Sequence, residues 1–138
     1  MTPIALLISL AGLSQREAAA FLEVSPSSID KMVRGVRSTP EGILAQLRSL
    51  IERQERAATQ TVQHATELVT VHGDPEFIEL GYPADDYEAQ QIGWPCVGAW
   101  RGMAARVVAV SAWPIRLVPR GTTSGSAAAI SQHEKPAG

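Results

Sequence analysis

The chain has 138 residues, of which 45% are hydrophobic and 19% are charged, the balance of an ordinary globular protein. This length suits one domain, or one small domain with an oligomerisation appendage. No apolar run approaches the ~18 residues that cross a membrane. The apolar segment at residues 4–8 has neither a basic residue before it nor a small-residue cleavage site after it, so it is expected to be a core helix rather than a signal peptide. The single cysteine, Cys96, excludes an internal disulfide and agrees with a cytoplasmic location.

The net charge of −2 argues against nucleic-acid binding only when the chain is taken as a whole. Residues 1–58 carry seven basic and six acidic side chains, a net of +1, whereas residues 59–138 carry five and eight, a net of −3. Lys31, Arg34 and Arg37 lie within seven residues of one another. Phosphate contact requires a local basic cluster of this kind, not a basic protein.

Helical spacing and capping residues predict helices throughout the first 60 residues. Ser14 with Glu17 three residues later forms a capping box. Ser25 is a good N-cap, and Pro26 follows at the first helical position, where a missing N–H costs nothing. The predicted spans are 3–11, 15–22, 26–34 and, with Thr39 as cap and Pro40 as its first residue, 40 to about 60.

The second half changes character and is predicted to be α+β. Gly73-Asp74-Pro75 separates two strand-like segments, so a hairpin is possible there. Beyond Arg120 the composition predicts a flexible tail. The predicted elements are strands at 67–72, 76–80 and 115–118, a short helix that begins within 83–88, and a helix over 96–111, for which a strand starting at 107–110 is the alternative.

These elements together predict a mainly α fold with an α+β C-terminal part. The expected organisation is a helical domain at 1–60, a small α+β dimerisation region at 61–120 and the tail at 121–138.

Residues 13–37 carry the functional prediction. Two short helices joined by a three- to four-residue turn must cross steeply, which leaves room only for a small side chain, here Ala19. The predicted shared core consists of Leu22, Val24, Ile29 and Met32. The opposite face is polar and free to enter a major groove, and it carries Gln15, Ser27, Ser28 and Lys31.

The pattern Leu-Ser-Gln-x-Glu-Ala-Ala…Leu-x-Val-Ser…Ile…Arg-Gly-x-Arg…Pro resembles the Cro and lambda-repressor-like, or XRE-type, helix-turn-helix family. The resemblance covers residue 3 to about residue 53 and implies a DNA-binding helical bundle. Glu23 departs from it, because the family often has glycine in the turn. A non-glycine residue there is expected either to adopt a left-handed conformation at some cost or to shape the turn differently.

The resemblance also implies which residues contact double-stranded DNA. Pro26, Ser27 and Lys31 would face base edges. Arg34 and Arg37 would hold the flanking backbone. The remaining residues are Gln15, which would bind phosphate at a helix N-terminus, Arg16, and Ser28, which would touch base or backbone. The alternative is that Lys31 and Arg34 are solvated surface charges on a protein-interaction scaffold.

The second half holds residue types that are enriched in interfaces, and it is therefore the expected site of homodimerisation. Local core packing of the same residues is an equal alternative. The run Ile92-Gly-Trp-Pro is loosely similar to the second domains of phage-type and anti-CRISPR-associated regulators. The candidate interface residues are Trp94, Trp100, Met103 and Trp113.

Other chemistry is not expected. His64, His72, His133 and Cys96 lack metal-ligand spacing. The acids at 85–88 suit a helix N-terminus better than acid–base catalysis. We therefore expect no enzyme, cofactor, metal or small-molecule ligand, but an autoregulatory repressor of phage or mobile-element type that binds an inverted repeat as a homodimer. The alternative is an antitoxin or protein-interaction module with secondary DNA binding.

Overall fold

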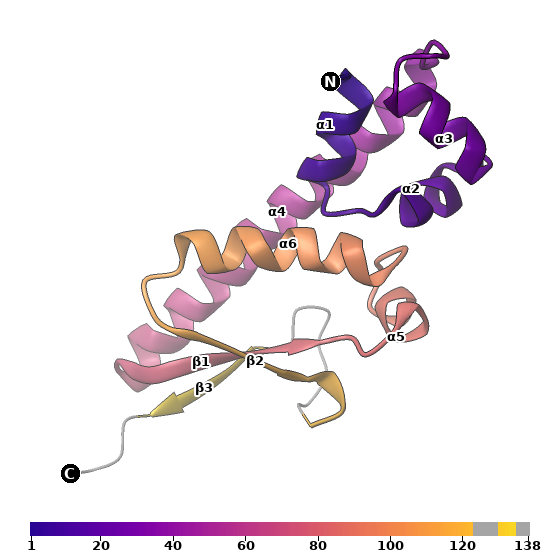
Figure 1. Cartoon of the computed structure of the whole chain (residues 1–138). Coiled ribbons are helices and arrows are strands. Elements are labelled where there is room, and N and C mark those ends of the chain that lie inside the picture. The colour runs from indigo at the N-terminus through magenta and orange to yellow at the C-terminus, as the bar shows by residue number, and fades with distance from the viewer. Residues whose placement is uncertain (123–129, 135–138) are drawn as a thin grey trace.

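The structure is a computed structural model that describes residues 1–122 and 130–134 (Figure 1). It is mostly helical and contains one small sheet in its C-terminal half, which agrees with the predicted mainly α fold with an α+β C-terminal part. The elements are α1 (Pro3–Leu10), α2 (Gln15–Leu22), α3 (Pro26–Val33), α4 (Glu41–His72), β1 (Pro75–Tyr82), α5 (Asp86–Gln91), α6 (Val97–Val110), β2 (Ile115–Pro119), the 3₁₀ turn η1 (Arg120–Thr122) and β3 (Ile130–Glu134).

The first three helices pack around the N-terminal half of α4 (Figure 1). Their apolar side chains meet in a buried cluster that includes Ile4, Ile8, Ile29 and Leu47. The predicted helix starts at Pro3, Gln15 and Pro26 are confirmed. The first helix ends one residue earlier than predicted and the third ends at Val33, because Gly12 and Gly35 adopt φ of +76° and +77° and turn the chain.

Helix α4 is longer than predicted and spans the molecule (Figure 1). It begins at Glu41, with Pro40 as its N-cap residue, one position later than expected. It then continues through 32 residues to His72. The strand predicted at 67–72 is therefore wrong, and so is the possible hairpin with residues 76–80.

Tertiary packing explains why the last turns of α4 are helical despite their β-branched residues. Ala58, Thr61 and Ala65 are buried at helical spacing, so the stripe that faces the rest of the protein continues past residue 60. The Thr66 and Thr70 hydroxyls donate to the carbonyl oxygens four residues earlier, at 2.9 Å each. Strand propensity is a weak preference that burial of one helical face overrides.

The sheet has the strand order β2-β1-β3. β1 and β2 are parallel, with Ile78 opposite Ile115, and β3 is antiparallel to β1. A parallel pair needs a long crossover, which α5 and α6 supply between β1 and β2. Residues 121–122 belong to η1 and β3 is a strand, so the flexible tail predicted from residue 121 is wrong at residues 121–122 and 130–134. The rest of that prediction, at 123–129 and 135–138, lies outside the described residues.

Helix α6 joins the two halves of the chain. It confirms the helix predicted at 96–111 over the alternative strand. Gly98 and Gly102 lie one turn apart on its face. A Cβ at Gly102 would overlap the backbone carbonyl of Ala11, which cannot move aside, whereas a Cβ at Gly98 would meet only the carboxylate at the end of the Glu17 side chain. These glycines let α6 lie directly against α2 and the end of α1.

Polar contacts reinforce this junction. The buried Gln54 amide of α4 donates to the carbonyl oxygens of Ala11 and Ala99, at 2.8 Å each. Arg106 of α6 donates to the carbonyl of Leu10 at 3.2 Å. The boundary expected at residue 60 thus falls inside one helix, and one hydrophobic cluster includes residues from both sides of it.

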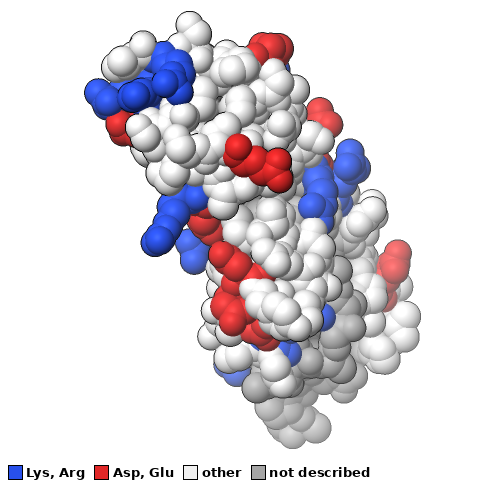
Figure 2. Space-filling view, turned by 90° about the vertical axis from the view of Figure 1, so that its right-hand side faces the viewer, with Lys and Arg blue, Asp and Glu red and all other residues white. Residues whose placement is uncertain are grey.

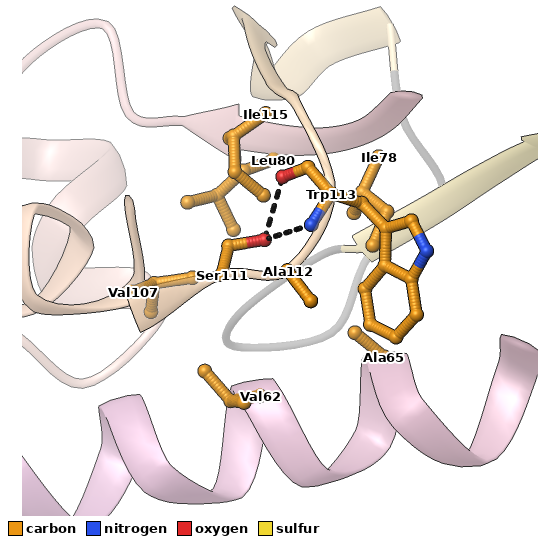
Figure 3. A pocket seen from close by; sticks show the side chains of 9 residues that line it. All are labelled: Val62, Ala65, Ile78, Leu80, Val107, Ser111, Ala112, Trp113 and Ile115. Carbon is orange, nitrogen blue, oxygen red and sulfur yellow. Dashed lines mark hydrogen bonds between the residues drawn. The ribbon is translucent and has the colours of Figure 1, made fainter. Parts of the chain in front are cut away.

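A small apolar cavity of about 10 Å³ lies between α4, β1 and the segment that follows α6 (Figure 3). Its one hydroxyl, on Ser111, donates to the carbonyl oxygen of Trp113 at 2.7 Å and accepts the Trp113 N–H at 3.1 Å. A space of this size holds a water molecule only where several polar partners line it. We interpret it as a packing gap. Its lining residues are Val62, Ala65, Ile78, Leu80, Val107, Ser111, Ala112, Trp113 and Ile115.

Among the described residues, no single helix is long and apolar enough to cross a membrane. α1 and α2 reach the required length and apolarity only when taken together, and they are bent by 97°.

Candidate nucleic-acid interface

The candidate site is built on α2 and α3, which are short helices joined by a three-residue turn. The predicted capping box begins α2: the Glu17 N–H donates to Ser14 Oγ, and the Ser14 N–H donates to the Glu17 carboxylate, each at 3.0 Å. The Ser25 hydroxyl accepts the Ser28 N–H at 3.0 Å and begins α3. Both helix starts are therefore set by local sequence, as predicted.

Glu23 closes α2 in the left-handed conformation, with φ +56° and ψ +43°. It is the one non-glycine residue with positive φ among the described residues. Of the two alternatives expected for a non-glycine residue in this turn, the left-handed conformation is the one observed. For a residue with a Cβ the conformation costs about 1–2 kcal/mol, and here the turn supports it with hydrogen bonds from the Glu23 and Val24 N–H groups to the end of α2.

The shared core of α2 and α3 is as predicted. Ala19 is buried where the helices meet, and Leu22, Ile29 and Met32 are buried around it. Val24 in the turn is half-buried and packs against the same cluster. With these apolar residues inside, the polar residues of both helices are left on the outer surface.

All eight of the predicted DNA-contacting residues are accessible. Ser28 and Lys31 are half-buried, and the other six are exposed: Gln15, Arg16, Pro26, Ser27, Arg34 and Arg37. Figure 2 shows basic side chains gathered at the end of the molecule that carries α3, and acidic ones gathered farther down, at the level of α5.

Two contacts show how the basic residues near α3 are held. Arg37 Nη1 donates to the hydroxyl of Ser28 at 2.9 Å, so this arginine lies over the first turn of α3. Arg34 instead pairs with Asp30 at 2.9 Å, in a bridge whose partners are both about half exposed. The Arg37–Ser28 contact could not be predicted from helical spacing, because it depends on the turn at Gly35 that brings the chain back.

This arrangement favours an anion at the start of α3. A helix N-terminus carries a partial positive charge from its unpaired N–H groups. Arg37 adds a full positive charge beside it and retains further guanidinium donors. Lys31 lies one turn beyond Ser28 and is held by no salt bridge among the described residues.

The structure corrects the predicted dimer-interface residues. Trp94 and Trp100 are each 4% exposed, and Met103 is 1% exposed. They belong to the hydrophobic cluster of their own chain, so the alternative of core packing is the one observed. Trp113 is half-buried against the cavity of Figure 3. Sequence could not separate the two cases, because aromatic residues fill cores and interfaces for the same physical reason.

The acidic residues that begin α5 serve helix capping, as predicted. The Asp85 carboxylate accepts the Glu88 N–H at 2.9 Å. Asp86 accepts the Val97 N–H at 2.9 Å, so it also supports the start of α6.

Glu17 has a second role that the sequence did not reveal. Besides capping α2, its carboxylate accepts the Gly98 N–H of α6 at 2.8 Å. Partial burial raises the pKa of Glu17, but the hydrogen bonds from the Ser14 and Gly98 backbone outweigh it, and the pKa lies below its usual value of 4.5. Glu17 therefore faces the second half of the chain and not the exposed face of α2 and α3.

Cys96, at the N-cap of α6, lies beside this carboxylate. Burial raises the pKa of its thiol to about 11, and the negative charge of Glu17 adds to the effect. The thiol is therefore protonated near neutral pH and is not in the reactive thiolate form.

Comparisons with known proteins assign no role to this site. No model of a known protein family matches the chain, and a search of curated proteins finds no similar sequence.

Proposed function

We propose that the α2–α3 pair is a helix-turn-helix that binds double-stranded DNA, and that the protein is an autoregulatory transcriptional repressor. One observation carries the proposal: the apolar side of the pair is buried in a shared core, while its outer face carries accessible polar and basic side chains. A face of this shape and chemistry suits the major groove.

In this proposal α3 is the helix that enters the groove. Ser27 and Lys31 read base edges, and the ammonium group of Lys31 reaches the acceptors O6 and N7 of guanine. Ser28 and Arg37, which are hydrogen-bonded to each other, bind the DNA backbone as one unit. Gln15 and Arg16, at the start of α2, and Arg34, after α3, hold the flanking phosphates.

The regulator acts as a homodimer on an inverted repeat. A single module of this size buries only about 600–1,000 Å² of protein surface on DNA. Two modules on half-sites about 34 Å apart supply the selectivity that one lacks. Bound near its own promoter, such a dimer represses by excluding RNA polymerase, as expected of a small regulator encoded by a phage or mobile element.

Footprinting of the promoter upstream of its own gene, across a salt series, tests the proposal. We expect a palindromic footprint that weakens steeply as salt rises, because counterions are released when basic residues meet phosphates. Absence of protection at every salt concentration below about 50 mM overturns DNA binding. Protection of a single half-site overturns the homodimer and leaves the helix-turn-helix.

Two single variants test the division of roles. Lys31→Ala is expected to lose affinity for the protected site more than for random DNA, by about 1–3 kcal/mol. Arg37→Ala is expected to weaken both equally, since phosphates carry no sequence. Arg101→Ala, at an exposed position on α6, is the matched control and should change neither. Equal losses of specificity in the Lys31 and Arg37 variants contradict the assignment.

A further inference from the structure

Trp94, Trp100 and Met103 are buried in their own chain, so they cannot form the dimer interface expected from the sequence. An open groove elsewhere on the protein offers an accessible surface instead. An open groove of about 520 Å³ runs between the middle of α4 and the C-terminal half of α6. Its lining residues are Glu55, Ala58, Thr59, Val62, Gln63, Arg106 and Val110.

Exposed apolar residues lie in this groove and on the neighbouring end of α1. Val110, on α6, lines it and is 66% exposed. On the other side Arg106 donates to the carbonyl of Leu10, which places the end of α1 beside the groove. Leu10 and Leu6 lie one turn apart on α1, and each is about half exposed. Large exposed apolar groups gathered in one place mark an interaction surface, whereas single ones do not.

The charges in the groove indicate what covers it. Glu55 and Arg106 line the same groove from α4 and α6. In a two-fold symmetric pair the same patch meets itself, so each residue faces a residue of the other copy across the axis. One acidic and one basic residue in a self-facing patch can then form two equivalent ion pairs. This charge pattern complements a second copy of the chain.

The position of the groove agrees with this occupant. The C-terminal end of α6 lies on the opposite side of the molecule from α2 and α3 (Figure 1). Two copies joined there keep the outer faces of both α2–α3 pairs free.

We infer that the α4–α6 groove, with Leu6 and Leu10 beside it, is the surface through which two copies of this chain associate, with Glu55 of one copy opposite Arg106 of the other. The role of this homodimer in repression rests on the proposed function. The association itself does not, and it can be measured without DNA.

Sedimentation equilibrium of the full chain, from about 1 μM to about 1 mM, tests the inference. The expected result is a mass of twice the 14.7 kDa of one chain. Val110→Glu is expected to weaken association at least about tenfold, because it places a charge in an apolar contact. Val71→Glu, at a 76% exposed position near the end of α4 and outside the groove, is the matched control and should associate as the wild type does.

Charge reversal makes the test specific for the two-fold arrangement. Glu55→Arg places like charges together and is expected to weaken association strongly, whereas Glu55→Gln, which only removes the charge, should weaken it less. Arg106 is left unchanged, because its guanidinium also donates to the carbonyl oxygens of Gly102 and Leu10 within its own chain. A wild-type chain that stays at the mass of one chain, 14.7 kDa, across the whole series overturns the inference. An equal loss in the Val71 and Val110 variants also overturns it. A dimer that protects no DNA would instead sustain the inference and overturn only the proposed function.

Discussion

The α2–α3 pair and α6 use helices in opposite ways. Eight-residue α3 buries only Ile29 and Met32 and presents its other side to solvent. Fourteen-residue α6 buries half of its residues, including Trp100 and Met103, and serves mainly to hold the chain together. Residue type alone therefore does not locate function: Trp94 and Trp100 are structural, and the small polar residues on α3 form the candidate interface.

Trp100→Ala is expected to lower the free energy of unfolding by about 3–5 kcal/mol, the usual cost of removing a large buried aromatic side chain. Denaturant unfolding followed by circular dichroism measures it. Trp100→Phe should cost much less, because the indole N–H has no hydrogen-bond partner among the described residues. A Trp100→Ala chain that is as stable as the wild type but weaker in self-association would indicate that Trp100 lies in a dimer interface and not in the core.

Gln54→Ala tests the polar junction between the halves and is expected to cost about 2–4 kcal/mol. The variant removes a fully buried side chain and leaves the carbonyl oxygen of Ala11 without this donor, at about 1–3 kcal/mol for an unsatisfied group. The carbonyl of Ala99 lies inside α6 and keeps its helical hydrogen bond. Gln60→Ala, at an exposed position on the same helix, should change stability by no more than about 0.5 kcal/mol. Similar losses in both variants would argue against a structural junction at α6.

Glu17→Gln removes the negative charge of this side chain and nearly keeps its shape. Because the pKa of Glu17 is lowered in the folded chain, the unfolded chain takes up a proton first as the pH falls. The carboxylate therefore stabilises the fold above its usual pKa of 4.5, and this contribution disappears as the pH drops through the lower folded value. We expect wild type and variant to differ most near neutral pH and to converge in acid.

Unfolding measured at several pH values checks this prediction. Glu67→Gln, at an exposed position on α4, is the control and should show no comparable convergence. A constant difference between wild type and Glu17→Gln across the whole pH range would mean that the carboxylate acts only through packing.

Glu23→Gly is expected to have the smallest effect and the opposite sign. Glycine adopts positive φ without a steric penalty, so the variant should relieve part of the about 1–2 kcal/mol that a Cβ costs in this conformation. The gain is reduced because glycine also makes the unfolded chain more flexible. Thermal unfolding should show a modest rise in Tm. A clear fall would indicate that the Glu23 side chain stabilises the turn.

The sequence predicted those parts of the structure that depend on neighbours in the chain. Ser14 with Glu17, and Ser25 with Pro26, mark helix starts because capping is completed within about four residues. The turn at Glu23 was also recognised locally, as a position where a residue with a Cβ would adopt a left-handed conformation or reshape the turn, and the structure shows the first of these. The exposed candidate residues were also predictable, since the buried side of a short amphipathic helix determines which residues remain outside.

Tertiary structure decided whatever depends on contacts between distant residues. Residues 67–72 look like a strand in isolation, yet they are helical because Ala58, Thr61 and Ala65 continue the buried stripe of α4. No local pattern showed that the three core residues Trp94, Trp100 and Met103 would be covered by their own chain.

The hydrogen bond between Gly98 and Glu17 was equally unpredictable from the sequence, because it joins residues 81 positions apart. Local sequence determined where the helices begin and which face of α3 is polar, because caps and amphipathic spacing act within a few residues. Only the packed structure decided how far α4 extends, what α6 covers and which surface remains for a second copy, because burial depends on the whole chain.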